Sequence, residues 1–223
     1  MMRAMILAAG RGERMRPLTD HTPKPLLRVD GKPLLGHHLQ RLANAGYREI
    51  VINIAHLGEQ IRAYVGDGSA FGLHVRYSEE SEALETGGGI FRALPWLEDD
   101  LFLVINGDVW CDHPLTMPTL PRALLAHLVL IDNPAHHPQG DFFFDGRRIH
   151  PAGEPRFTFS GIGWYRPELF SHCKPGRFPL APLLREAMHQ GQVGGEYYAG
   201  IWRDVGTPER LAELNQLLEQ GMF

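Results

Sequence analysis

The order of the predicted strands and helices constrains the fold more than any other feature of the sequence. Residues 4–9 form a short apolar run typical of a buried strand. Residues 37–45 have the apolar spacing of a helix, which Gly46 is expected to stop. A second strand follows at residues 49–55 (EIVINIA). Such a β-loop-α-β unit predicts two parallel strands joined by a crossover helix.

The alternation continues to about residue 105. A helix is predicted at residues 57–65, a strand at 74–78, a short helix at 88–94 and a fully apolar strand at 101–105 (LFLVI). This order predicts an α/β fold of the Rossmann-like type, in which a mostly parallel central sheet carries helices on both faces.

The sequence changes character beyond residue 110. Prolines crowd between residues 114 and 138, and short β-like runs follow at 128–132, 142–144 and 157–165, which predict a smaller, irregular, β-containing lobe. The last predicted element is a closing helix at residues 207–220, with Thr207 as N-cap and Pro208 at its first position. Its apolar stripe consists of Leu211, Leu214, Leu217 and Leu218.

Length and composition limit the classes of protein that the chain can represent. A chain of 223 residues suits a single domain, and 43% apolar with 22% charged residues is an ordinary globular composition. The net charge of −4 gives no global reason to bind nucleic acid, so any affinity for anions must be local. No run approaches the about 20 apolar residues of a membrane span, and the N-terminal apolar run leads directly into a glycine loop rather than a signal-peptide cleavage site. With only Cys111 and Cys173, no disulfide framework is possible, and we expect a cytoplasmic protein without a membrane or nucleic-acid partner.

Residues 7–27 (LAAGRGERMRPLTDHTPKPLL) combine two glycines with several cations. Glycines admit close backbone approach and cations attract oxyanions, so the segment predicts a phosphate-binding loop. Lys24 stands between Pro23 and Pro25, and the following proline is expected to hold it in an extended backbone conformation that projects a positioned ammonium group. A solvated basic loop is the plain structural alternative.

Two familiar phosphate-binding motifs do not fit. A dinucleotide-binding fingerprint would need a third glycine where Met15 stands, which disfavours a nicotinamide-dependent oxidoreductase. A Walker A loop ending at Gly31-Lys32 would need a glycine at Leu26 and a hydroxyl residue at Pro33.

GRGERMRPLT followed by TPKPLL resembles the signature of the sugar-1-phosphate nucleotidyltransferases, whose pattern is Gly-x-Gly-Thr-Arg-Leu-x-Pro-Leu-Thr and then Pro-Lys-Pro. Three further segments resemble motifs of the same family: Leu-Glu-Thr-Gly-Gly at 84–88, Asn-Gly-Asp at 106–108 and WRDVGTPE at 202–209. Asn-Gly-Asp alone would also make an ordinary turn. The resemblance runs from residue 4 to about 215. It implies the nucleotide-diphospho-sugar transferase fold, with a nucleotide-binding half at about 1–110 and a sugar-binding half at about 111–206.

The resemblance also implies a reaction and its site residues. A sugar 1-phosphate oxygen attacks the α-phosphorus of a nucleoside triphosphate, pyrophosphate leaves, and Mg²⁺ assists. The implied catalytic residues are Arg14, Lys24 and Asp108, and the implied Mg²⁺ ligands are Asp108 and Asp204. The implied nucleotide-binding positions are Ala8, Ala9, Gly10, Arg11, Gly12, Glu13, Lys24, Gly87 and Gly88. The implied sugar-binding positions are Asn106, Gly140, Glu154 and Gly161.

The sequence departs from the family pattern at three places. Glu13 replaces the usual threonine, and its carboxylate is expected to point away from the triphosphate. Glu85 replaces a glycine, so the loop before the 88–94 helix is open to a different course. Gly153-Glu154-Pro155 lacks the lysine of the family's Glu-Lys-Pro element, and either Arg156 or Arg203 could substitute, or Lys24 and the metal could suffice.

Several questions stay open at the level of sequence. Compact mannose-1-phosphate guanylyltransferases share most of these motifs, so the residues alone do not identify the base or the sugar. A nucleotide-sensing subunit without turnover is a further alternative, which the presence of both aspartates and Lys24 disfavours. His136 and His137, in a proline-rich loop, are expected at the surface rather than in catalysis. The chain ends soon after its closing helix, without the hexapeptide-repeat domain of bifunctional relatives, which suits a free-standing monomer.

Overall fold

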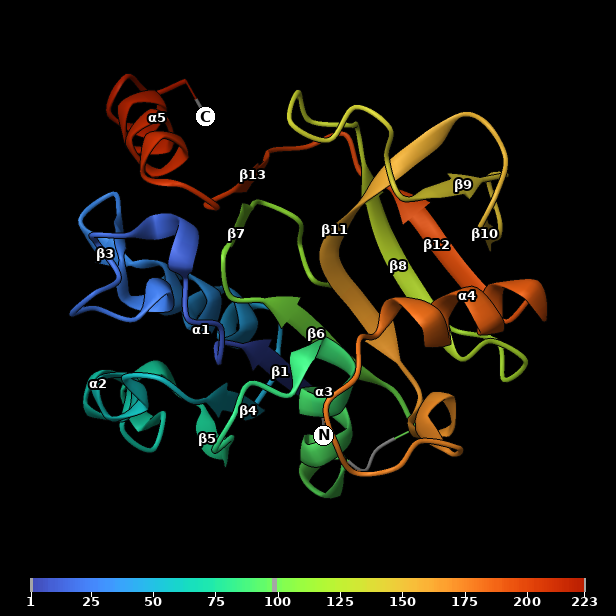
Figure 1. The fold of residues 1–223 in the computed structure, drawn as a ribbon, viewed down its shortest axis with the longest axis horizontal. Helices are drawn as coiled ribbons and strands as arrows, with labels where there is room; N and C mark the ends of the chain where they lie inside the picture. Colours follow the sequence, from blue (N-terminus) through green and yellow to red (C-terminus); the bar gives the residue numbers. More distant parts are fainter. Residues whose placement is uncertain (1, 98–99, 223) are drawn as a thin grey trace.

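Four parallel strands form the centre of the computed structural model, which describes residues 2–97 and 100–222 (Figure 1). These strands are β1 (Arg3–Leu7), β4 (Glu49–Ile54), β5 (His74–Glu79) and β6 (Phe102–Asn106), and they lie in the order β5-β4-β1-β6. Leu7, at the end of β1, is opposite Asn53 of β4 and Asn106 of β6. Three strand ends therefore meet at one edge of the sheet, where open α/β folds bind their ligands.

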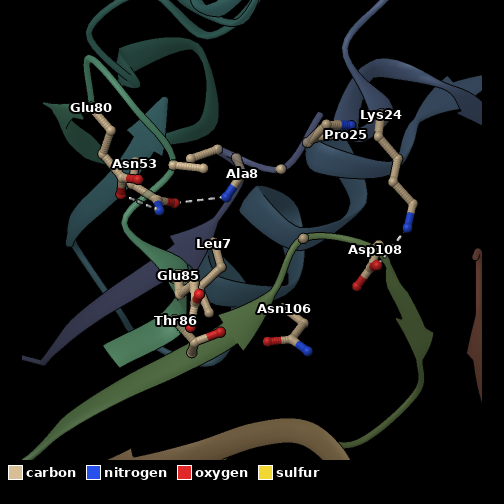
Figure 2. Close-up of a pocket in the computed structure, with 14 residues that line it drawn as sticks. Leu7, Ala8, Lys24, Pro25, Asn53, Glu80, Glu85, Thr86, Asn106 and Asp108 are labelled. Carbon is tan, nitrogen blue, oxygen red and sulfur yellow. Dashed lines mark hydrogen bonds and ion pairs between the residues drawn. The ribbon is translucent and has the colours of Figure 1, made fainter. Parts of the chain in front are cut away.

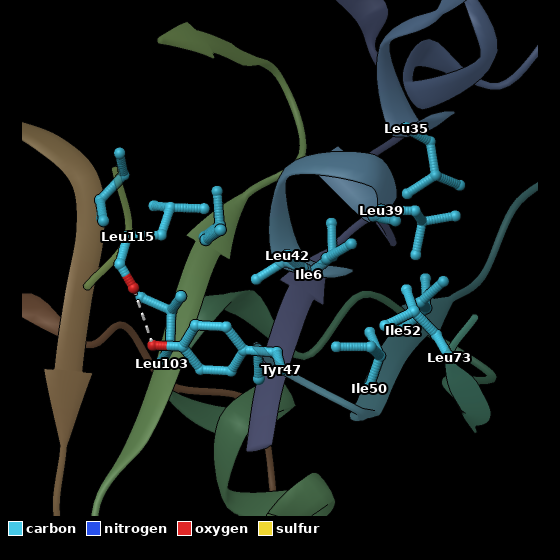
Figure 3. Close-up of a cluster of buried hydrophobic side chains, with 14 of the residues drawn as sticks. Ile6, Leu35, Leu39, Leu42, Tyr47, Ile50, Ile52, Leu73, Leu103 and Leu115 are labelled. Atoms are coloured by element: carbon cyan, nitrogen blue, oxygen red, sulfur yellow. Dashed lines mark hydrogen bonds between the residues drawn. The ribbon is translucent and has the colours of Figure 1, made fainter. Parts of the chain in front are cut away.

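Helices cover both faces of this sheet. Helices α1 (Leu34–Asn44) and α2 (Gly58–Val65) pack on one face, and α3 (Glu85–Leu97) and α4 (Ala181–His189) pack on the other. Alternate residues of the strands point to the two faces, as the pleat requires. Figure 3 shows the first of these cores, where Ile6, Ile50, Ile52 and Leu103 of the sheet meet Leu35, Leu39 and Leu42 of α1.

The second half of the chain extends the same sheet. Strand β11 (Arg156–Tyr165) runs antiparallel to β6 and also pairs with β8 (Ala126–Ile131) and β9 (Phe142–Phe144). Strand β12 (Val193–Tyr197) lies parallel to β8, and β10 (Ile149–His150) pairs with β9. The irregular lobe therefore shares β11 with the parallel core.

The end of the chain returns to the first half. Strand β13 (Trp202–Asp204) pairs with β7 (Val109–Cys111), and α5 (Pro208–Glu219) then lies beside the hairpin of β2 (Arg28–Val29) and β3 (Lys32–Pro33) (Figure 1). A small core joins α5 to this region and includes Met15, Leu27, Val29, Leu34, Val205, Leu211 and Leu214. Within the described residues, short 3₁₀ turns lie at Glu13–Met15, Lys24–Leu26, Ser69–Phe71 and Pro167–Phe170.

The structure confirms the predicted fold class and every predicted strand and helix, with boundary shifts of a few residues. Thr207 is the N-cap of α5, and its side-chain oxygen accepts a hydrogen bond from the backbone N–H of Arg210 at 3.4 Å, as the sequence predicts for this helix start. Helix α4, the short strands β2, β3 and β10, and strands β7, β12 and β13 are not among the predicted elements. Within residues 2–97 and 100–222, no helix is both long and apolar enough to cross a bilayer.

Candidate functional site

A cavity of about 240 Å³ lies where the parallel strands end (Figure 2). Its walls come from the ends of β1, β4 and β6, the start of the glycine loop and the start of α3. The lining residues are Leu7, Ala8, Ala9, Gly10, Lys24, Pro25, Asn53, Glu80, Ala83, Glu85, Thr86, Asn106, Gly107 and Asp108. We call this the first cavity. Six of the residues predicted from sequence lie on its wall, namely Ala8, Ala9, Gly10, Lys24, Asp108 and Asn106.

A buried polar network fixes one wall of the first cavity. The side chain of Asn53 accepts a hydrogen bond from the backbone N–H of Ala8 at 2.7 Å and donates to the Glu80 carboxylate at 2.8 Å (Figure 2). The other Glu80 oxygen accepts from the backbone N–H of Leu84 at 2.9 Å. A Cβ at Gly89 would lie 2.8 Å from Glu80, so this glycine makes room for the network. Sequence reasoning missed Asn53 and Glu80, although Asn53 stands near the end of a predicted strand at the ligand-binding edge.

The glycine loop has its shape because of Gly12. This residue has φ +65, and a Cβ there would lie 3.0 Å from the Thr19 side chain and 3.2 Å from that of Lys24. The Thr19 hydroxyl donates to the Gly12 carbonyl at 2.8 Å and closes the loop. Glu13 begins the following 3₁₀ turn, is exposed and lines neither this cavity nor the second one described below, in agreement with a carboxylate that points away. Arg11 also lies outside both cavities.

Lys24 brings the Pro-Lys-Pro element to the end of β6. The expectation of an extended Lys24 was wrong by one residue: Pro23 is extended, and Lys24 is the first residue of a 3₁₀ turn that contains Pro25. The Lys24 side chain is buried, and its ammonium nitrogen lies 2.5 Å from a carboxylate oxygen of Asp108 (Figure 2). A cation from the signature segment therefore meets the carboxylate of Asn-Gly-Asp.

A second cavity, of about 340 Å³, adjoins the first and shares Asn106 and Asp108 with it. Its other walls come from β11, β13, the glycine loop and the segment between β8 and β9. The lining residues are Arg14, Asn106, Asp108, Val109, His136, His137, Asp141, Thr158, Phe159, Ser160, Trp202 and Asp204. Arg14 thus faces the second cavity rather than the first.

Asp108 and Asp204 lie close together although 96 residues separate them in sequence. Asp204 is opposite Val109 in the β7–β13 ladder, and the backbone N–H of Val205 donates to the Asp108 carbonyl at 2.9 Å. Both carboxylates line the second cavity. Among the described residues, no three His, Cys, Asp or Glu side chains converge as a complete metal site. Two hard oxygen donors fit Mg²⁺, which usually takes one or two carboxylates and completes its shell with substrate phosphates and water.

The glycines predicted for the sugar side support neighbouring side chains. Gly161 has φ +80 where the pairing of β11 shifts register, and a Cβ there would lie 2.6 Å from the Asn106 side chain. Gly140 has φ +60, and its Cβ would lie 2.6 Å from Asn133. Glu154 is exposed in a turn and lines neither cavity. The structure therefore brings Asn106 and Gly161 together and leaves Glu154 outside.

Neither candidate substitute for the missing lysine lines the first or the second cavity. The Arg156 guanidinium donates to the backbone carbonyl of Asp141, and Arg203 donates to that of Trp202. His136 and His137, by contrast, line the second cavity. Their side chains are 38% and 40% exposed, so they lie at the surface as expected, and the expectation that they take no part in catalysis stays a prediction. Their ring nitrogens lie 3.3 Å from Asp204 and 3.1 Å from Asp141 respectively. The proline-rich segment gave no signal of this because tertiary folding brings it to β13.

The glycines after Glu85 face a different part of the chain. A Cβ at Gly87 would lie 2.5 Å from Phe178, and one at Gly88 would lie 2.3 Å from the Gly176 carbonyl. These positions are packed on their Cβ side, and Glu85 and Thr86 supply this segment's contribution to the first cavity. The nucleotide contact expected of Gly87 and Gly88 stays a prediction. Glu85 itself adopts φ +60, a conformation that glycine, the family residue at this position, takes at no steric cost.

An open α/β sheet with a glycine loop and convergent carboxylates at its strand ends is the architecture of nucleotide-binding α/β enzymes. The sequence matches the nucleotidyl transferase family over residues 3–124, and the chain belongs to this family.

Two relatives of the same name align with nearly the whole chain. The N-acetylmuramate alpha-1-phosphate uridylyltransferase of Neisseria meningitidis is 53% identical, with 97% of this chain and 98% of the relative covered. The protein of the same name from Caulobacter vibrioides is 35% identical, with 97% of both chains covered. Among solved structures, HddC from Yersinia pseudotuberculosis, complexed with GMP-PN, matches with a TM-score of 0.79 at 20% identity and covers 98% of this chain and 100% of its own.

Proposed function

We propose that the protein is a uridylyltransferase that joins UTP and N-acetylmuramic acid 1-phosphate to give UDP-N-acetylmuramic acid and pyrophosphate. The 53% identity to a uridylyltransferase of that name across both chains supports the substrates. The observation that carries the reaction type is the meeting of the two cavities at Asn106 and Asp108, beside Lys24. A triphosphate in the first cavity and a sugar phosphate in the second would have their reacting groups there.

The chemistry asks the protein for alignment and charge rather than for proton transfer. A phosphate monoester oxygen is already a nucleophile, so its in-line attack on the α-phosphorus needs no general base. Lys24 is placed to neutralise charge that builds up between the reacting phosphates. Arg14, with its planar set of donors, would bind phosphate oxygens from the side of the second cavity.

We further propose that Asp108 and Asp204 hold a Mg²⁺ ion. Both line the second cavity, and Asp108 also lines the first. When bound, the ion would neutralise and orient phosphate oxygens. Asn106, beside Gly161, lines the second cavity and would hydrogen-bond the sugar.

The substrates are tested by a pyrophosphate-release panel in which four nucleoside triphosphates meet the 1-phosphates of N-acetylmuramic acid, N-acetylglucosamine, glucose and mannose. We expect the highest kcat/KM for UTP with N-acetylmuramic acid 1-phosphate. Preference for GTP with mannose 1-phosphate would replace the proposal with a guanylyltransferase. Absence of pyrophosphate with every pair would point instead to a nucleotide-sensing subunit.

The proposed product places the reaction in the cell's handling of peptidoglycan, because N-acetylmuramic acid is a sugar of that polymer. Both substrates are small anions, and we propose that the enzyme acts in the cytoplasm as part of peptidoglycan recycling. The net charge of −4 fits this assignment, since such a protein has no general attraction to nucleic acid or anionic lipid.

A further inference from the structure

Both carboxylates proposed to bind Mg²⁺ already carry a cation from the chain. The ammonium group of Lys24 lies 2.5 Å from Asp108. The guanidinium group of Arg210 lies 2.5 Å from Asp204, and the ring of His136 lies 3.3 Å from the same oxygen. Each carboxylate is thus occupied at one oxygen by a group that competes with a metal ion for its charge.

The contact between Arg210 and Asp204 is built into the start of α5. Thr207 caps this helix by accepting from the backbone N–H of Arg210, which fixes Arg210 in the first turn. A Cβ at Gly206 would lie 2.7 Å from both the Arg210 guanidinium and the Asp204 carboxylate. The side chains of Asp204 and Arg210 are only 20% and 25% exposed, so solvent screens the pair less than it would at the surface. Gly206 and the Thr207 cap therefore hold the Arg210 guanidinium against the Asp204 carboxylate.

Each of the two carboxylates is paired with one cation, Asp108 with Lys24 and Asp204 with Arg210. Arg14 and Asp141, which also line the second cavity, carry opposite charges. Of the other carboxylates in the first cavity, Glu85 pairs with Arg177, and Glu80 accepts hydrogen bonds from Asn53 and the backbone of Leu84. Mg²⁺ gives up its water shell reluctantly and binds where negative charge exceeds positive charge. A triphosphate in the first cavity would supply that excess.

We propose that Lys24 and Arg210 keep the two carboxylates neutralised, so that a divalent cation binds stably only together with the nucleotide. The inference rests on the proposed metal role of Asp108 and Asp204. Arg210 lines neither cavity, so it acts through Asp204 as a positioning residue. It differs in this from Lys24, which lines the first cavity.

The experiment uses Mn²⁺ as the probe, with free ion measured by electron paramagnetic resonance and protein-bound ion by water proton relaxation. The full-length wild-type protein is titrated without nucleotide and with UTP, in the absence of any sugar phosphate so that no turnover occurs. We expect Mn²⁺ to bind at least tenfold more weakly without UTP than with it. Arg210→Met should bind Mn²⁺ at least tenfold more tightly than wild type when UTP is absent, and Arg210→Lys, which keeps the charge, should stay near wild type.

Two further variants guard the interpretation. Arg185→Met removes the same charge from an exposed position on α4 and should leave Mn²⁺ affinity unchanged. Arg210→Gln removes the charge but keeps a hydrogen-bond donor for Asp204, and it serves if the methionine variant unfolds. The inference would be overturned if wild-type protein bound Mn²⁺ equally well with and without UTP. It would also be overturned if Arg210→Met and Arg210→Gln both bound Mn²⁺ no more tightly than wild type when UTP is absent. Either result would leave the proposed function unaffected. If Mn²⁺ binds in neither condition, the proposed metal site fails as well.

Discussion

At the scale of single residues, Lys24 and Asp108 connect the two sequence motifs that carry the chemistry. Lys24 comes from the signature segment and Asp108 from the end of β6, and their side chains meet at 2.5 Å. The resemblance named both residues, but no pattern in the sequence indicated that they touch. Their contact depends on the 3₁₀ turn at Lys24–Leu26, which directs the ammonium group toward the strand end.

Removing either charge should slow the reaction strongly. For Lys24→Ala and for Asp108→Asn we expect kcat to fall about a hundredfold or more, equivalent to about 3 kcal/mol of lost transition-state stabilisation. Pyrophosphate release at saturating substrates measures this. Arg16→Ala is the matched control, because Arg16 pairs with Asp20 and its side chain is 71% exposed. Near wild-type turnover in both active-site variants would rule out the proposed mechanism.

His38 makes the folded protein sensitive to mild acid. This α1 residue is buried, and burial together with the nearby charge of Arg41 lowers its pKa from 6.5 to about 3. The unfolded chain therefore takes up a proton at a higher pH than the folded protein does, and stability is lost as the pH falls from about 6.5 toward 3.

Between pH 7.5 and pH 5 we expect this histidine to cost the folded protein about 2 kcal/mol of unfolding free energy. Urea denaturation at both pH values, compared with His38→Leu, isolates the effect because the other histidines are common to both proteins. The variant should lose about 2 kcal/mol less stability than wild type over this range. If both proteins lost the same unfolding free energy between pH 7.5 and pH 5, His38 would not be the cause of the pH dependence.

At the scale of elements, local signals predicted what short-range physics determines. Thr207 and Pro208 predicted the start of α5, and short apolar runs between helical segments predicted the parallel strands. Strand β12 (VGGEY) contains two glycines and forms because β8 lies beside it, so its own sequence carries little signal. The same holds for β7 and β13, which pair across a long sequence separation and bring Asp204 to Asp108.

A substitution in the glycine loop tests whether position 12 requires a residue that adopts a left-handed backbone conformation. Gly12→Ala should destabilise the protein by about 1 to 2 kcal/mol, because φ is +65 and the new Cβ would press on Thr19. Gly10→Ala is the paired variant: no atom lies within 4 Å of a Cβ at that position, so its stability should stay near wild type. Urea denaturation of both proteins measures the difference. Equal stability would mean that the loop accepts a side chain at position 12.

At the scale of the whole molecule, a single sheet runs through both the parallel core and the second lobe. Strand β11 pairs with β6 of the parallel core and with β8 and β9 of the second lobe. Tyr47 strengthens this junction: its hydroxyl donates to the Leu115 carbonyl at 3.2 Å (Figure 3). The same hydroxyl accepts from the Trp164 indole at 2.9 Å. The halves inferred from motifs are therefore joined by backbone pairing and by a buried hydrogen-bonded tyrosine, which sequence patterns do not show.

This continuity leads us to expect one cooperative unfolding transition rather than one per half. Far-UV circular dichroism and tryptophan fluorescence should give coincident urea curves, since Trp96 belongs to α3 in the first half and Trp164 to β11 in the second. Tyr47→Phe leaves the buried Trp164 N–H and Leu115 carbonyl without this partner and should cost about 2 kcal/mol while the transition stays single. The curve would then shift to lower urea without splitting. Two separated transitions, in wild type or in the variant, would show that the parallel core and the second lobe fold independently despite their shared strand.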